Sequence, residues 1–204
     1  WEDINGDNKI NGLDREVVGN IFPKVTGGFS STLSWKGISL YARFDYALGH
    51  TLYNDLAART LGQYQGAFNI ITEVKDMWSE DNPNSDLPAF YYADQLAKKN
   101  ITRSNNASAS RHNNSSRLYE KADHLALREL TLSWDLPKAW TSKAFIQNAS
   151  VYVTGQNLFY VTGYTGTSPE PVLTNSDNNE NLYGVDQGRY PTPRTVLFGL
   201  SVTF

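Results

Sequence analysis

Residues 190–204, which read YPTPRTVLFGLSVTF, decide the class of fold. From Val196 onward, large apolar side chains alternate with small, mostly polar ones, which is the period of a β-strand with two different faces. Such an apolar face is buried in a soluble sheet, or it faces lipid in an outer-membrane barrel, whose strands have about 9–11 residues and an aromatic rim. The final aromatic residue favours the barrel. One face carries Val196, Phe198, Leu200, Val202 and Phe204, and the other carries Leu197, Gly199, Ser201 and Thr203.

The composition excludes several classes of fold and of binding site. The 204 residues are 40% hydrophobic and 19% charged. No apolar run reaches the roughly 18 residues that a transmembrane helix needs. A formal net charge of -3 gives no support to nucleic-acid binding, and the lack of cysteine excludes disulfides and thiolate metal sites. Because the chain opens on Trp1 and runs straight into a motif, we expect it to be a piece of a longer protein.

Residues 3–14, DINGDNKINGLD, have the spacing of a calcium-binding loop. Asn8 stands where such loops usually have glycine, although asparagine also tolerates left-handed dihedral angles. Asp14 replaces the usual bidentate glutamate, which predicts weaker binding. The alternative is a turn that orders itself by hydrogen bonds between its side chains and its backbone. The candidate calcium ligands are Asp3, Asn5, Asp7, the backbone carbonyl of Lys9, Asn11 and Asp14.

Residues 28–50 predict a β-hairpin with its turn at Trp35–Gly37. Apolar and polar residues alternate on both sides of the turn, and the second strand is long and cleanly sorted. In a soluble sandwich its polar face would meet water, and in a wide barrel it would line a wet lumen. The apolar face carries Leu40, Phe44 and Tyr46, and the polar face carries Ser39, Arg43 and Asp45.

Residues 122–134, ADHLALRELTLSW, predict another strand, but only if it contains a bulge. Leu125 and Leu127 are at odd-numbered positions, whereas three further apolar residues, at 130, 132 and 134, are at even-numbered positions. In a regular strand the two groups would therefore lie on opposite faces. A one-residue bulge at Arg128–Glu129 would put all five on one face. Without it, the arginine would join the apolar face, at a cost of about 2–4 kcal/mol near mid-bilayer. A further strand is expected from Val151 to about residue 162.

Long polar stretches separate the expected strands. Residues 50–117 are too long for a simple connection and indicate a functional or covering loop, with a short amphipathic helix near residues 70–78. Aromatic residues of the loops are candidates for substrate stacking, namely Trp78, Tyr91, Tyr92 and Tyr164. The expected segments are a loop at 1–27 with the calcium-type motif, a β-hairpin at 28–50, a long loop at 50–117, two strands at 122–160, a loop at 163–193 and a terminal strand at 194–204.

The long and the short connections between the expected strands fall at opposite ends of the sheet. If consecutive strands are antiparallel, the stretches 1–27, 50–117 and 163–193 leave one end of the sheet, and the short connections leave the other. Outer-membrane barrels have long extracellular loops and short periplasmic turns, so we expect the long stretches to be extracellular. About five strands are too few for a closed barrel, which needs about eight or more. The expected fold class is therefore all-β, an antiparallel segment of a larger transmembrane β-barrel with long extracellular loops.

The chain resembles the C-terminal part of SusC/RagA-type TonB-dependent outer-membrane transporters of Bacteroidetes. The resemblance spans nearly the whole chain, and the ordered series of motifs is more specific than any single one. The motifs are the D-x-N-G-D loop followed by Asp14–Arg15, Pro23 with Gly27–Phe29, Leu125–Leu136 running into Asp-Leu-Pro, Val151–Phe159, Tyr164, Pro169–Glu170, and Tyr190–Thr195 leading into the terminal strand.

The resemblance implies that the whole protein is a barrel of about 22 strands with an internal plug. It implies active import of oligosaccharides or peptides across the outer membrane, in which a SusD-like surface lipoprotein caps the barrel. The plug and the segment that contacts TonB are N-terminal in the family and lie outside this chain. The expected partners are the SusD-like lipoprotein, TonB, the rest of the barrel, outer-membrane lipid and the oligosaccharide or peptide.

Two other classes of function are consistent with parts of the sequence. A soluble, calcium-stabilised β-module could bind carbohydrate through the same loop aromatics, and detergent-free solubility as a folded monomer would favour it. An enzyme has little support, because His50, His112 and His124 are scattered and the sequence has no nucleophile elbow and no HExxH motif. We therefore expect no enzymatic activity, and we expect each histidine at the surface of a loop or strand.

Overall fold

The computed structural model describes residues 2–8, 12–61, 69, 71–87, 116–170, 183–188 and 190–204. The chain divides into two compact units, which are treated separately below. The sheet unit comprises residues 23–50, 122–163 and 190–204, and the loop unit comprises residues 1–22, 51–121 and 164–189. No helix in the described part of the chain is long and apolar enough to cross a membrane.

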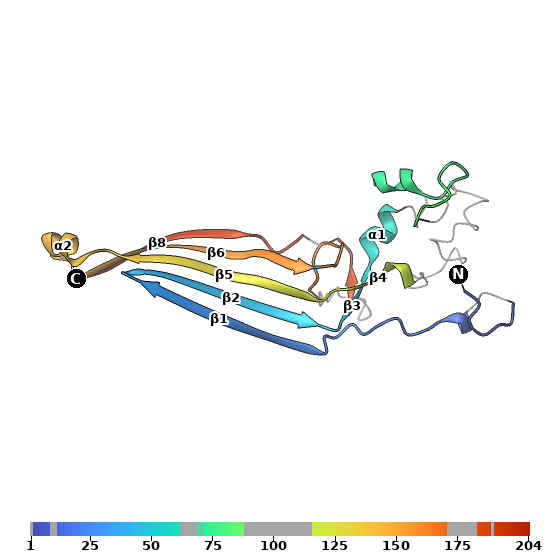
Figure 1. The fold of residues 1–204 in the computed structure, drawn as a ribbon, viewed down its shortest axis with the longest axis horizontal. Coiled ribbons are helices and arrows are strands. Elements are labelled where there is room, and N and C mark those ends of the chain that lie inside the picture. Colours follow the sequence, from blue (N-terminus) through green and yellow to red (C-terminus); the bar gives the residue numbers. More distant parts are fainter. Residues whose placement is uncertain are drawn as a thin grey trace, which may run out of the picture. The chain divides into compact units, whose positions relative to one another are not determined.

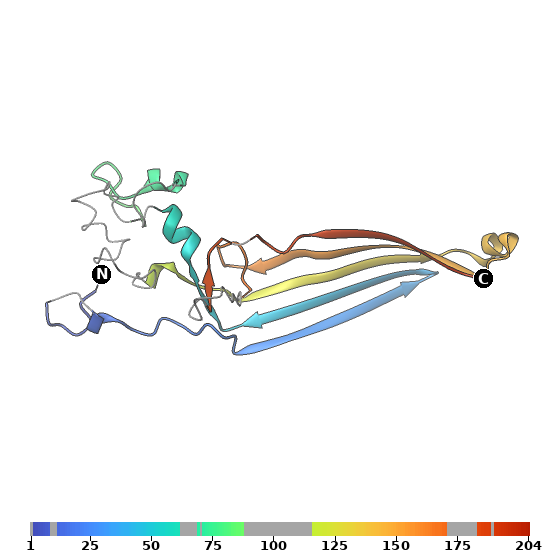
Figure 2. The same ribbon diagram turned by 180° about the vertical axis from the view of Figure 1, so that it is seen from behind.

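The sheet unit contains one five-stranded antiparallel sheet, with its strands side by side in Figure 1. Seen from behind in Figure 2, the same sheet has β1 and β8 as its two edges. The predicted antiparallel β-fold is confirmed. In spatial order the strands are β1 (Val25–Trp35), β2 (Ile38–Leu48), β5 (His124–Asp135), β6 (Asn148–Thr162) and β8 (Thr195–Thr203).

Short connections leave one end of this sheet. Strands β1 and β2 are joined by Lys36 and Gly37, whose φ angles of 48° and 83° are both positive, as a type I′ hairpin turn requires. Strands β5 and β6 are joined by α2 (Lys138–Thr141) and the 3₁₀ helix η5 (Ser142–Ala144). The chain between β2 and β5, and between β6 and β8, leaves the opposite end. Short and long connections are thus sorted as the sequence predicted.

The loop unit has a second, three-stranded sheet of very short strands, in the order β4-β3-β7. Strand β3 pairs antiparallel with β4 and parallel with β7. Its small core consists of Tyr53, Ala58, Leu118 and Val185. The elements are η1 (Gly12–Asp14), β3 (Thr51–Asn54), α1 (Asp55–Thr60), η2 (Thr72–Asp76), η4 (Ser116–Leu118), β4 (Tyr119–Lys121) and β7 (Val185–Asp186).

The loop unit adds short elements that the sequence did not predict, and it corrects one expected helix. The stretches 50–117 and 163–193 were expected to be long loops, and the structure places the short elements β3, α1 and β7 within them. Strands of two to four residues are too short to show a period of two, so alternation cannot reveal them. The amphipathic helix expected near 70–78 is the five-residue 3₁₀ helix η2, with no α-helical turn among its described residues.

Candidate functional site

The sheet unit has one continuous apolar face. Directly paired residues of antiparallel strands share a face, so the register determines which side chains lie together. One row runs from Phe198 through Val153 and Leu132 to Leu40 and Leu33. Most of its large side chains are exposed, and Phe198 is 82% exposed. The same face carries the other residues predicted to share it, namely Phe44, Tyr46, Leu130, Trp134, Leu200 and Val202.

The opposite face is polar and lined with hydroxyl groups. The hydroxyl oxygens of Ser34 and Ser39 lie 2.8 Å apart, and those of Thr131 and Thr154 are also 2.8 Å apart. Gly199 leaves room for the ring of the cross-strand Tyr152, which a Cβ at that position would strike. The register places all the residues predicted for this face here, namely Ser39, Arg43, Asp45, Ser201 and Thr203.

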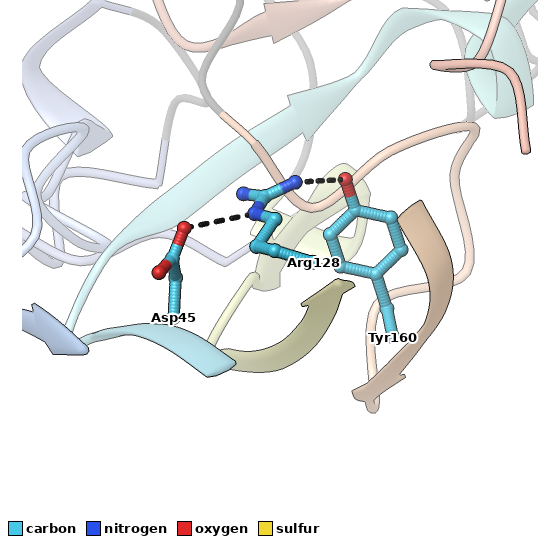
Figure 3. A network of polar contacts seen from close by, with 3 residues as sticks. All are labelled: Asp45, Arg128 and Tyr160. Carbon is cyan, nitrogen blue, oxygen red and sulfur yellow. Dashed lines mark hydrogen bonds and ion pairs between the residues drawn. The ribbon is translucent and has the colours of Figure 1, made fainter. Parts of the chain in front are cut away.

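The predicted bulge in β5 is confirmed. Arg43 pairs with Glu129, and the next residue, Phe44, pairs with Leu127, so Arg128 is the extra residue. The side chain of Arg128 turns to the polar face, where Nε donates to Asp45 Oδ2 at 2.9 Å. Its Nη1 donates to the Tyr160 hydroxyl at 3.1 Å (Figure 3). The bulge therefore keeps both a charge and its partners off the apolar face.

The expectation that the histidines lie at the surface is wrong for His50 and His124. His50 is 1% exposed and His124 is 5% exposed. The His124 ring packs edge-on against the rings of His50 and Tyr160, with 5.7 Å between ring centroids in both pairs. The register puts His124 on the polar face, opposite the small side chain of Ala47, so the neighbouring rings can close over it. The third histidine, at position 112, lies outside the described residues.

The calcium-type loop is held by hydrogen bonds from its backbone to its side chains. The Asp3 carboxylate accepts the backbone N–H groups of Gly6, Asp7 and Asn8, at 2.8, 3.2 and 2.6 Å. Asp14 Oδ1 accepts the N–H of Ile4 at 3.1 Å, which closes the loop. Asn8 adopts φ 60°, the left-handed conformation that its position was expected to need.

These bonds match the self-ordered turn that was the alternative to a calcium site. They do not exclude a cation, because a carboxylate has about four acceptor positions and can receive N–H groups and a metal together. Among the described residues, no group of three or more His, Cys, Asp and Glu side chains is placed to hold a metal ion. Of the six predicted ligands, Lys9 and Asn11 lie outside the described residues, so calcium stays a prediction.

The predicted substrate residue Tyr164 is buried, with 7% of its surface exposed. Its hydroxyl donates to Asp186 Oδ2 at 3.0 Å, and Asp186 also accepts the N–H groups of Thr167 and Gly188 at 2.8 and 2.9 Å. Burial, reinforced by the neighbouring Asp186 carboxylate, raises the pKa of the Tyr164 phenol. The ring therefore ties one loop to β7, and it is not presented at the surface for stacking.

A second carboxylate, Glu120, organises the loop unit in the same way. Its Oε1 accepts the side-chain amide of Asn54 at 3.0 Å, and its Oε2 accepts the N–H of Thr165 at 2.9 Å. Sequence reasoning missed both Glu120 and Asp186. The only signal was the Asp186-Gln-Gly188 turn, in which the aspartate side chain accepts the N–H two residues on.

The remaining substrate candidates are only partly described. Trp78 is exposed, and its backbone N–H donates to the Leu87 carbonyl at 2.9 Å, which fixes the strand-like stretch that carries it. Residues Tyr91 and Tyr92 lie outside the described residues. A substrate role for Trp78 therefore stays a prediction.

An antiparallel sheet with an exposed apolar face, a hydroxyl-lined polar face and short turns at one end has the architecture of a β-barrel wall. The chain is 30% identical over its full length to TonB-dependent receptor P3 of Formosa agariphila, and 31% identical to TonB-dependent receptor P26 of the same organism. It spans 19% of the length of each of these relatives. No protein-family model matches the sequence.

Comparison with solved structures also indicates similarity to this class of outer-membrane protein. The structure of the RagAB peptide transporter matches 92% of this chain and 18% of that chain, with a TM-score of 0.68 and 28% identity. The RagAB peptide importer in its closed-closed state matches with a TM-score of 0.67 and 27% identity. These findings confirm the resemblance: the chain is similar, from end to end, to a segment of SusC/RagA-type TonB-dependent receptors.

Proposed function

We propose that this chain forms part of the outer-membrane barrel wall of a TonB-dependent importer. The observation that carries the proposal is the apolar face of the five-stranded sheet, on which large side chains such as Leu33, Leu132 and Phe198 are exposed. Monomeric soluble proteins rarely leave so large a contiguous apolar patch uncovered, whereas lipid covers such a face in a barrel. Because the chain spans about a fifth of its relatives' length, transport itself is a property proposed for the whole protein.

The proposed cargo is an oligosaccharide or a peptide. The RagAB structures are of a peptide transporter, and the curated relatives are TonB-dependent receptors, so transport and not catalysis is the function that they support. The long connections within 50–117 and 163–193 leave one end of the sheet, and we place them outside the cell. There they would meet a SusD-like lipoprotein and shape the substrate cavity, with TonB acting on the part of the protein outside this chain.

The soluble carbohydrate-binding module is the less favoured function. It needs a second layer over the apolar face of the sheet, as the two sheets of a sandwich provide for each other. In the described part of the chain, the large residues of that face, such as Leu33, Phe198 and Leu200, stay exposed. Purification of residues 1–204 as a folded, detergent-free monomer would favour the module and count against the barrel wall.

We also propose that residues 3–14 bind calcium with low affinity. The support is the alternation of Asp3, Asn5 and Asp7, together with positive φ angles at Gly6 and Asn8, which fold the stretch into a tight turn. When bound, the ion would supply only a rigid loop, and Asp3 would both accept backbone N–H groups and ligate. Extracellular calcium modules function with dissociation constants of about 10⁻⁴–10⁻³ M, so a weak site would suffice.

The test of the proposed function is uptake by cells that lack the gene and are complemented with the full-length protein. Labelled peptide and oligosaccharide pools are supplied separately, with and without dissipation of the proton-motive force. We expect complementation to restore energy-dependent uptake of one of the two classes, and that class identifies the cargo. Uptake that is identical with and without the protein, for both pools, would contradict the proposal.

A further inference from the structure

The connection between β5 and β6, residues 136–147, exposes aromatic rings at the short-turn end of the sheet. Trp140 in α2 is 60% exposed, and Phe145, directly after η5, is 91% exposed. Figures 1 and 2 both show α2 beyond the end of β5, at the end of the sheet where the C-terminus lies, and the C-terminal residue, Phe204, is exposed as well. Single exposed apolar side chains are common, so what matters is whether these rings extend a larger apolar surface.

Trp140 continues the apolar face of the sheet past the ends of its strands. The Trp140 ring packs edge-on against Trp134, with 5.8 Å between the ring centroids. Trp134 belongs to the apolar face, where it pairs with Ile38 on β2 and Val151 on β6. If the sheet lies in lipid, as proposed above, Trp140 and Phe145 lie beyond the strand ends, where the hydrocarbon gives way to headgroups and barrels carry girdles of aromatic residues.

The backbone at Phe145 has an unusual conformation, and hydrogen bonds of the turn hold it in place. Its φ of 59° lies in the left-handed region, which bulky residues rarely adopt and which glycine or asparagine would fill without strain. Two backbone hydrogen bonds hold the turn, from Phe145 N–H to Ser142 O at 3.3 Å and from Ile146 N–H to Thr141 O at 3.2 Å. Thr141 is buried, so the turn is anchored on one side while the Phe145 side chain stays exposed.

The charged residues within the two short connections are all lysines, and one acidic residue, Asp135, lies at the end of β5 directly before the second connection. Lys36 lies in the β1–β2 turn, and Lys138 and Lys143 lie in the β5–β6 connection, and neither connection contains Asp or Glu. All three lysines are exposed, and the Lys36 ammonium lies 4.6 Å from the centre of the Trp35 ring. Lysines beside interfacial aromatic rings are complementary to anionic phospholipid headgroups.

We propose that residues 136–147 are a lipid-headgroup anchor that binds anionic phospholipid, a role that rests on the proposed membrane location of the sheet. Trp140 and Phe145 lie at the boundary of the acyl chains, and Lys138 and Lys143 bind headgroup phosphates. The anchor fixes the depth of β5 and β6 at the end where the connections are short. This occupant is favoured over a protein partner because the exposed Trp140 ring packs against Trp134 and so continues the proposed lipid-facing side of the sheet.

A depth measurement on the full-length protein tests the location. This chain contains no cysteine, so Phe145→Cys, Leu200→Cys and Tyr190→Cys each give one labelling site within it. Labels are quenched by lipids brominated near the headgroup, by lipids brominated deep in the chain, and by aqueous iodide. We expect shallow lipid quenching at 145, lipid quenching at 200, and iodide quenching at 190. Iodide quenching at 145 with lipid quenching at 200 would overturn the anchor alone, whereas iodide quenching at both would overturn the barrel wall too.

Removal of the lysine charges tests whether residues 136–147 bind anionic phospholipid. The variant Lys138→Gln/Lys143→Gln is compared with Lys75→Gln/Lys121→Gln, which removes the same charge from exposed lysines of the loop unit. Binding of phosphatidylglycerol to the full-length protein is measured in phosphatidylcholine vesicles. Each lysine near the surface contributes about fivefold, so we expect roughly 25-fold weaker binding in the first variant and no change in the second. Equal affinity in the two variants would show that the lysines do not bind the headgroup.

Discussion

The depth of each apolar row in the bilayer can be tested with arginine substitutions on β8. Leu200 lies in the row of Trp134, at the aromatic end of the apolar face, whereas Val196 lies in the row of Leu130 and Ala42. The two positions are four residues apart, or about 14 Å along a strand at roughly 3.4 Å per residue. A strand tilt of about 40° converts this distance into roughly 10 Å of depth, nearly half of an apolar band about 25 Å tall.

Val196 is therefore expected near mid-bilayer and Leu200 near the rim. An arginine costs about 2–4 kcal/mol at the midplane of a barrel and about 0–1 kcal/mol near the interfaces. We expect Val196→Arg to destabilise the assembled full-length protein by the larger amount and Leu200→Arg by the smaller. The matched control is Leu197→Arg, because Leu197 lies at the same depth as Val196 but on the polar face.

The assay is equilibrium unfolding by guanidinium chloride of the full-length protein in lipid vesicles, with membrane assembly as a second readout. Ser201→Arg, on the polar face beside Leu200, should be as mild as the Leu197 variant. Equal costs at 196 and 197 would show that the two faces do not meet different solvents. A larger cost at 200 than at 196 would move the midplane toward the short-turn end and refute the depth assignment.

Three further substitutions have defined outcomes. Tyr164→Phe removes a donor from the buried Asp186 carboxylate, so it should cost the loop unit about 1–3 kcal/mol and speed amide exchange in β7. Burial raises the pKa of Tyr164, so the Tyr164–Asp186 hydrogen bond contributes fully to the stability of the loop unit below about pH 10. This contribution is lost as the pH rises further. Amide protection in β7 that does not fall at alkaline pH would contradict this. Asp7→Ala should abolish calcium binding in calorimetry without impairing barrel assembly, and equal heats would argue against the site. Gly199→Ala should displace the Tyr152 ring and destabilise the sheet, visible as a lower unfolding midpoint.

The sequence predicted the sheet unit well because its strands are long. Strand β2 has 11 residues and β8 has 9, enough for alternation to specify two faces without knowledge of any partner strand. The bulge was predictable for the same reason: a change of parity between Leu127 and Leu130 left one extra residue, and charge made Arg128 the one to exclude. The start of β1 at Val25, three residues before the expected hairpin, was hidden by the two glycines at 27 and 28.

The loop unit was not predictable in this way. Its strands have at most four residues, and they are held by side-chain hydrogen bonds between segments far apart in sequence, such as Asn54 to Glu120 and Thr165 to Glu120. Such pairs leave no periodic trace. Tyr164 shows the same limit, because an aromatic residue in a polar stretch predicts exposure, and only the fold shows that Asp186 draws its hydroxyl inward.

The Arg128 bulge explains how a charged residue can interrupt an apolar strand without breaking the wall. A single extra residue in β5 would bring its two halves out of phase with β6 unless β6 compensated. The register shows the compensation: Glu129 pairs with Gln156 and Leu127 pairs with Phe159, so two residues of β6, Asn157 and Leu158, face the bulge together. Asn157 has a positive φ of 52°, which lets the backbone turn there. Both strands therefore return to the same alternation, and the apolar face remains continuous on either side of the arginine.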